Sequence, residues 1–115
     1  MQIDYRIFEE ITLANTGKYR ICLDNKLERD KAPHVHLALG KTRSIASVCI
    51  YDGFVLAGKV PAEVRTDLKI WMEYYRSELL ENWELMKRNL PQKCVEWNIP
   101  KLKEEIRKRA KQAMS

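Results

Sequence analysis

A long apolar stripe with a helical period dominates the second half of this chain. Apolar residues recur at steps of three and four from Val64 to Met86. That spacing places them on one face of an α-helix. Pro61 is suited to the first turn, where its missing N–H is not needed. The spacing predicts one helix from Pro61 to about Asn89. Its predicted core residues are Trp71, Leu79 and Trp83.

Strand signals fill the half of the chain before that stripe. Short runs rich in apolar and β-branched residues span 19–23, 34–39, 44–51 and 54–57. Asp52-Gly53 favours a two-residue hairpin of type I′, in which both residues take positive φ. The period of residues 2–13 is ambiguous between strand and helix. Strands followed by helices predict an α+β domain: an antiparallel meander of three to four strands packed by one long helix.

Length and composition fit one small globular domain. The chain has 115 residues, of which 45% are hydrophobic and 32% charged. No apolar run approaches the roughly 20 residues of a membrane span, and the first residues lack the features of an export signal. The cysteines Cys22, Cys49 and Cys94 are odd in number and far apart, which favours reduced thiols. We therefore expect a cytoplasmic protein with no membrane association.

Positive charge is concentrated at the C-terminal end. The net charge is +5, and residues 101–115 hold six basic and two acidic residues, or +4. Pro100 and a narrow apolar stripe after it predict a basic amphipathic helix. We expect a domain over 1–99 and a helical tail over 100–115. Such tails are most often solvated helix ends, but they also bind nucleic acid or acidic partners. The candidate binding residues are Lys101, Lys103, Arg107, Lys108, Arg109 and Lys111.

The only two histidines of the chain stand two residues apart in one predicted strand. His34 and His36 should point to the same side, about 7 Å apart along the strand. Val35, Leu37 and Leu39 form an apolar row on the opposite side, which predicts that the histidines face away from the core. Two adjacent imidazoles are suited to binding a metal, transferring a proton or holding a phosphate.

Three interpretations of the histidine pair are open. A divalent metal such as zinc would take both histidines and Asp30 as ligands, leaving a position for water. Metal-free RNA cleavage would use them as general acid and base, with Arg43 and Arg76 as supporting cations. A non-catalytic pair would only hold the preceding loop, with Asn82 or Glu81 on the helix as hydrogen-bond partners.

The stretch from Asp30 to Ile99 resembles a family of small bacterial and phage proteins, domain of unknown function 4160. The matching segments are Pro33-His34-Val35-His36, Asp52-Gly53, Gly58-Lys59-Val60-Pro61, Trp71 and Glu78-Leu79-Leu80-Glu81-Asn82-Trp83. The family pattern has Pro-Pro-His-Phe-His and a further histidine upstream. This chain has Ala32 in place of the first proline and Asp30 in place of the upstream histidine. The basic helix after Pro100 is an addition. The resemblance implies the fold and an association with toxin–antitoxin pairs.

These features lead to an expected function with alternatives. We expect a toxin–antitoxin-type or regulatory domain that acts through a small antitoxin-like protein partner or through RNA. One alternative is a ribonuclease, metal-free or metal-dependent, that uses the His34/His36 pair. Another is a phage-type inhibitor of a host defence system. Whether the chain is an enzyme stays open, and a homo-oligomer formed through the tail is a further alternative.

Overall fold

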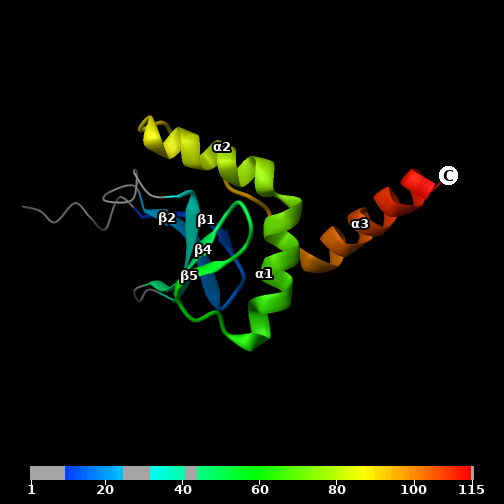
Figure 1. Ribbon diagram of the computed structural model, residues 1–115, viewed down its shortest axis with the longest axis horizontal. Helices are drawn as coiled ribbons and strands as arrows, with labels where there is room; N and C mark the ends of the chain where they lie inside the picture. The colour runs from blue at the N-terminus through cyan, green and yellow to red at the C-terminus, as the bar shows by residue number, and fades with distance from the viewer. Residues whose placement is uncertain (1–9, 25–31, 41–43, 115) are drawn as a thin grey trace, which may run out of the picture.

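The computed structural model describes residues 10–24, 32–40 and 44–114, and within them five strands precede three helices (Figure 1). The strands are β1 (Glu10–Asn15), β2 (Tyr19–Asp24), β3 (His34–Leu39), β4 (Ser44–Cys49) and β5 (Val55–Gly58). They form one antiparallel sheet in chain order. The helices are α1 (Ala62–Tyr74), α2 (Arg76–Lys87) and α3 (Ile99–Met114). The predicted α+β meander is confirmed, with more than three to four strands because the ambiguous N-terminal segment supplies β1.

The core lies between one face of the sheet and the first two helices. Alternate residues of the central strands are buried on that face: Ile21, Leu23, Val35, Leu37, Ala46 and Val48. The helical stripe packs against them, and the predicted core residues Trp71, Leu79 and Trp83 are at most 2% exposed. Burying a large apolar side chain contributes about 1.5–3 kcal/mol, so this stripe is the main reason the helices cover the sheet.

The prediction of one continuous helix is wrong at Tyr75. Its backbone, at φ −99° and ψ 21°, ends α1 and begins α2. α1 runs along the sheet, whereas α2 turns across its end (Figure 1). At this break the Arg76 Nε donates to the Ile50 carbonyl at 3.2 Å, and the Tyr75 ring packs 5.8 Å from that of Trp71. Tertiary contacts therefore bend the helix where the local sequence has no breaker.

The predicted hairpin at Asp52-Gly53 forms, but with a longer loop. Cys49 N–H donates to Phe54 O at 2.8 Å, and Gly53 N–H donates to Cys49 O at 2.9 Å. Gly53 has φ +78°, whereas Asp52 is not in the positive-φ region. The type I′ assignment is therefore wrong. Asp52 contributes a side-chain acceptor instead, since its Oδ1 accepts the Phe54 N–H at 3.0 Å.

The link between α2 and α3 is held by side chains of both earlier helices. The buried Asn82 amide donates to Lys93 O at 3.0 Å and accepts from Lys93 N–H at 2.7 Å. Trp71 Nε1–H donates to Glu96 O at 2.7 Å. These bonds satisfy backbone groups of an irregular segment and fix the point at which α3 begins.

α3 is attached to the body at its first turn and then projects away from it (Figure 1). Ile99 and Leu102 are buried in the core, whereas Ile106 is already 38% exposed. The principal extents of 63 × 30 × 21 Å reflect this arm. Within the described residues, no helix has the length and apolar character that crossing a membrane requires.

Candidate functional site

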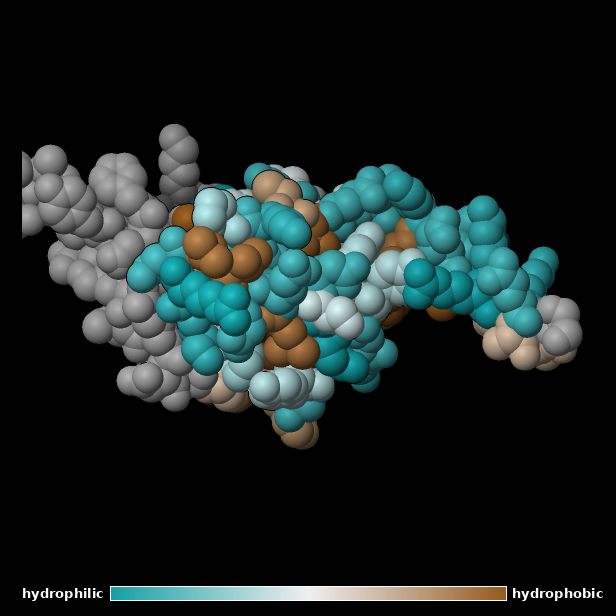
Figure 2. All heavy atoms as spheres, turned by 90° about the horizontal axis from the view of Figure 1, so that it is seen from above, coloured by the Kyte–Doolittle hydropathy of each residue, from teal (hydrophilic) through white to brown (hydrophobic). Residues whose placement is uncertain are grey.

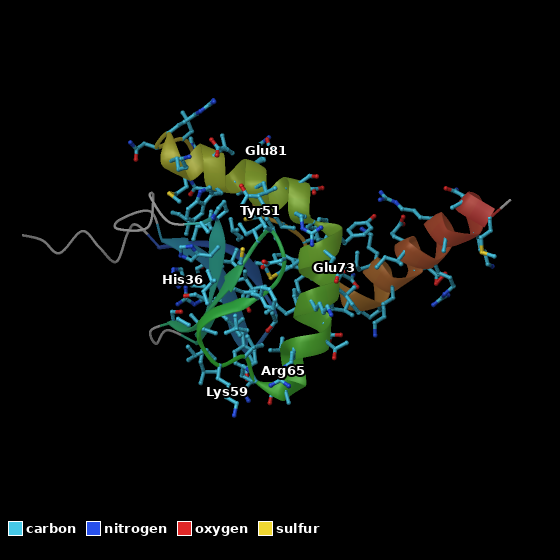
Figure 3. The ribbon with its side chains drawn as sticks, in the orientation of Figure 1. His36, Tyr51, Lys59, Arg65, Glu73 and Glu81 are labelled. Atoms are coloured by element: carbon cyan, nitrogen blue, oxygen red, sulfur yellow. The ribbon has the colours of Figure 1, made fainter. Side chains whose placement is uncertain are left out.

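The two histidines belong to a polar row on the face of the sheet opposite the core. The strand register pairs Thr12 with Cys22, Cys22 with His36, and His36 with Ser47. Directly paired residues point to the same side of a sheet, so the row crosses four strands. His36 lies on the side of the sheet away from α1 (Figure 3). We call this surface the histidine face and define it by Thr12, Arg20, Cys22, His34, His36, Ser44, Ser47 and Cys49.

His34 is the buried member of the pair. It is 3% exposed, and its ring lies 5.1 Å from Trp83 and 4.9 Å from His36, centroid to centroid. Its Nδ1 lies 2.7 Å from the Ala32 carbonyl oxygen. A carbonyl only accepts, so Nδ1 carries the proton and Nε2 is the basic nitrogen of the neutral ring. The rings are closer than the 7 Å expected along the strand because they lean toward each other.

His36 is half-buried, and its neighbours fix the same tautomer. Its Nδ1 lies 3.1 Å from both Ser44 Oγ and Ser47 Oγ. Ser44 donates its own hydroxyl proton to Ala46 O at 2.9 Å, so it accepts from His36. Nε2 is again the basic nitrogen. Holding Nδ1–H in this way orients an imidazole for proton transfer or for a ligand at Nε2.

Sequence reasoning did not find Arg20 and Cys22, which complete the histidine face. Arg20 Nη1 donates to Thr12 Oγ1 at 3.2 Å and to Cys22 Sγ at 3.5 Å, and its Nε donates to Gly40 O. Because side chains alternate along a strand, Arg20 and Cys22 lie on the face of β2 away from Ile21 and Leu23. Only the register of β2 against β3, which pairs Cys22 with His36 and Arg20 with Ala38, brings them to the histidine strand, and a single sequence does not reveal that register.

The other predicted site residues that the structure describes have partners elsewhere. Arg76 donates to the Ile50 carbonyl at the helix break. Asn82 and Glu81 both bind Lys93, through its backbone and its ammonium, rather than supporting the histidines as predicted. Asp30 and Arg43 lie outside the described residues. Among the residues that are described, no three His, Cys, Asp or Glu side chains gather in a group that could hold a metal ion.

The predicted tail cations lie along the exposed arm of α3. Lys103, Arg107 and Lys111 follow at steps of four and therefore share one helix face over about 12 Å. Figure 2 shows the arm covered mainly by hydrophilic residues.

Three cations of the helix have partners: Lys101, Arg109 and Arg107, which is itself a member of that row. Lys101 bonds Glu96 at 3.1 Å, and this hydrogen bond raises the pKa of Lys101. Arg107 pairs with Glu104 at 2.7 Å, and the Arg109 guanidinium lies 4.8 Å from the centre of the Tyr74 ring. The helix is thus positioned by its base, with excess positive charge beyond it.

Comparison with known proteins gives one match. A family model described as "Domain of unknown function (DUF4160)" matches residues 19–84, which is more than half of the chain. The matched segment runs from β2 into α2 and includes the histidine pair, the hairpin and Asn82-Trp83. It ends before α3. No curated protein and no solved structure matches the chain.

Proposed function

The chain belongs to the DUF4160 family, and we propose that it is a small regulatory domain of the toxin–antitoxin type that acts by binding RNA through α3. The observation that carries this proposal is the arm itself. Residues 101–115 have a net charge of +4, while the rest of the chain has only +1. A projecting helix with this charge attracts a polyanion without sequence preference.

Placement of the cations favours a binding surface over a merely solvated tail. Ile99 and Leu102 anchor the base of the helix in the core. The row of Lys103, Arg107 and Lys111 is therefore presented in a fixed direction. Ordered cations lose less entropy on binding phosphates than cations on a flexible chain.

The experiment removes this row while keeping the helix. Lys103→Gln/Arg107→Gln/Lys111→Gln deletes three positive charges, and glutamine has a helix propensity similar to that of lysine and arginine. We expect the affinity for a fluorescein-labelled single-stranded RNA, measured by anisotropy, to fall roughly tenfold or more.

A matched control carries the same change in net charge on the body. Lys59, Lys69 and Lys87 are exposed cations of the body, and Lys59→Gln/Lys69→Gln/Lys87→Gln should bind the RNA nearly as wild type does. If both triple variants lose affinity equally, α3 is not the binding surface. If wild type does not bind RNA, the proposal is wrong.

RNA cleavage on the histidine face is a second candidate function. The observation that favours it is the shared tautomer of His34 and His36, which makes Nε2 the basic atom of both rings, on the sheet face that also carries Arg20. One ring would take a proton from the attacking hydroxyl and the other would give one to the leaving group. A guanidinium stabilises charge that develops on phosphate oxygens.

Growth and RNA integrity distinguish the two functions. Under the cleavage hypothesis, induction of the wild-type chain alone should arrest bacterial growth and fragment RNA. His34→Ala/His36→Ala should do neither at equal soluble expression, and His36→Gln, which preserves volume, should also be inactive. Under the α3 hypothesis the histidine variants should still bind RNA. Intact RNA after induction of wild type would exclude the nuclease.

A further inference from the structure

β5 forms one edge of the sheet and exposes unusually apolar side chains. It pairs with β4 on one side, and no further strand pairs with its outer edge within the described residues. Phe54 is 71% exposed, Val55 47% and Leu56 53%. An edge strand offers its outward N–H and C=O groups as a template for another strand. Contiguous exposed apolar residues are typical of interaction sites.

A hollow of about 280 Å³ lies beside this edge, between the hairpin and α1. Its apolar wall is formed by Val48, Val55, Val60, Leu68 and Met72. Val55 is paired with Val48, so it points to the core side of the sheet. The core is therefore incomplete at this edge, with room for an additional apolar side chain.

The cations near this hollow set the chemistry of its occupant. Arg65 and Lys69 line it, and Lys59 follows β5 directly. Lys59 and Arg65 lie near each other at the start of α1 (Figure 3). In the described part of the chain, neither Lys59 nor Lys69 has a carboxylate partner, whereas Arg65 donates to Val60 O at 2.9 Å.

One carboxylate also lines the hollow. This carboxylate belongs to Asp52, and its Oδ1 accepts a hydrogen bond from the Phe54 N–H. Two cations, Arg65 and Lys69, line the hollow with this single acid, and Lys59 adds a third positive charge directly after β5, so this edge is positive overall.

We propose that the β5 edge binds an extended, acidic segment of a partner protein as a sixth strand. Such a strand would lie about 4.8 Å from β5 and share main-chain hydrogen bonds with it. Residues on its core side would place an apolar side chain in the hollow. Acidic residues next to that side chain would meet Lys59 and Lys69. This surface is separate from α3, so the inference does not depend on RNA binding.

Charge excludes a second copy of this chain as the preferred occupant. Two-fold pairing of β5 with itself would bring the same patch of each copy together. Lys59 and Lys69 of both copies would then lie in one interface, where the four positive charges repel one another. An acidic segment turns the same cations into favourable contacts.

The test selects displayed random peptides on the full-length protein. We expect the enriched peptides to alternate apolar and polar residues and to carry Asp or Glu next to an apolar residue. In ¹⁵N–¹H spectra they should shift the amides of residues 54–59 and 65–72. Leu56→Asp and Lys59→Glu/Lys69→Glu should each lower the affinity for the enriched peptides at least about tenfold.

A matched variant and the alternative outcomes complete the test. Lys103→Gln/Arg107→Gln/Lys111→Gln should bind the selected peptides as wild type does, because α3 is not part of this surface. All variants must first match the thermal melt of wild type, which exposed substitutions allow. Absence of enrichment, or peptides that bind the β5 variants unchanged, would overturn the proposal. So would a dimer in light scattering that Leu56→Asp dissociates.

Discussion

At the scale of single residues, Gly58 is the glycine with the least space around it. It has φ +72°, and a Cβ there would lie 2.9 Å from Ala46 Cα and closer still to Ile45 O. Gly53 has a similar φ of +78° but open space around it. Both glycines are thus needed for backbone conformation, and only one of them also for close approach of the neighbouring strand.

Substituting asparagine for Gly53 and for Gly58 distinguishes the need for a positive φ from the need for close approach of the neighbouring strand. Asparagine tolerates the left-handed region, so Gly53→Asn should lower the free energy of unfolding by less than about 1 kcal/mol. Gly58→Asn should lower it by about 2 kcal/mol or more, because the side chain meets the β4 backbone. Urea unfolding followed by circular dichroism measures both. Equal losses would mean that β5 does not approach Ile45 and Ala46 as described.

Glu63 gives the fold a predictable response to acid. Its Oε2 accepts hydrogen bonds from Lys18 Nζ at 3.1 Å and from Tyr19 OH at 3.0 Å, joining α1 to the β1–β2 turn. The bond from Lys18, and then that from Tyr19, lowers the pKa of Glu63 below its ordinary value of 4.5. The unfolded chain therefore takes up this proton first as the pH falls, so acid favours unfolding.

Replacing Glu63 by Gln removes that response. Between about pH 6 and about pH 3, the free energy of unfolding of wild type should fall more steeply than that of Glu63→Gln. Urea titrations at several pH values give both slopes. High salt should reduce the difference between the two slopes, because the Lys18–Glu63 ion pair is exposed and therefore screened. Parallel slopes at low salt would contradict the role given to this carboxylate.

At the scale of elements, the link from α2 to α3 depends on Asn82. Asn82→Ala should lower the free energy of unfolding by about 1–3 kcal/mol, because it leaves the Lys93 N–H and C=O without their side-chain partner. Glu81→Ala removes only an exposed ion pair to Lys93 and should cost about 0.5 kcal/mol or less. Thermal melts of the two variants decide this, and equal melting temperatures would show that Asn82 does not hold the link.

Local patterns predicted the elements better than their arrangement. The apolar period of 64–86 correctly identified the residues that cover the sheet, because burial follows helix geometry. It did not predict the break at Tyr75, which depends on contacts with distant Ile50. The alternation in 34–39 placed both histidines on one face. Arg20 and Cys22 join them only through strand register, and register depends on pairing between segments far apart in sequence.

At the scale of the whole molecule, the α3 arm and the β5 edge are two separate surfaces with different chemistry. The α3 arm carries excess positive charge away from the body, and the β5 edge exposes apolar side chains beside cations. The family match covers β5 but ends before α3. We therefore expect peptide binding at β5 to be shared by relatives that keep these residues, whereas the proposed RNA binding depends on α3, which lies outside the matched residues. Truncation after Ala110 should weaken RNA binding and leave the binding of the selected peptides unchanged, and fluorescence anisotropy measures both.

The most direct test of RNA binding through α3 is the salt dependence of RNA affinity. Each phosphate contact with single-stranded RNA contributes about −0.7 to the slope of log K against log salt concentration. From about 50 to about 200 mM salt, Lys103→Gln/Arg107→Gln/Lys111→Gln should reduce the magnitude of that slope by about 2. The body control, Lys59→Gln/Lys69→Gln/Lys87→Gln, should keep the wild-type slope. A wild-type affinity that does not change with salt, or a slope that the α3 variant leaves unchanged, would contradict the account.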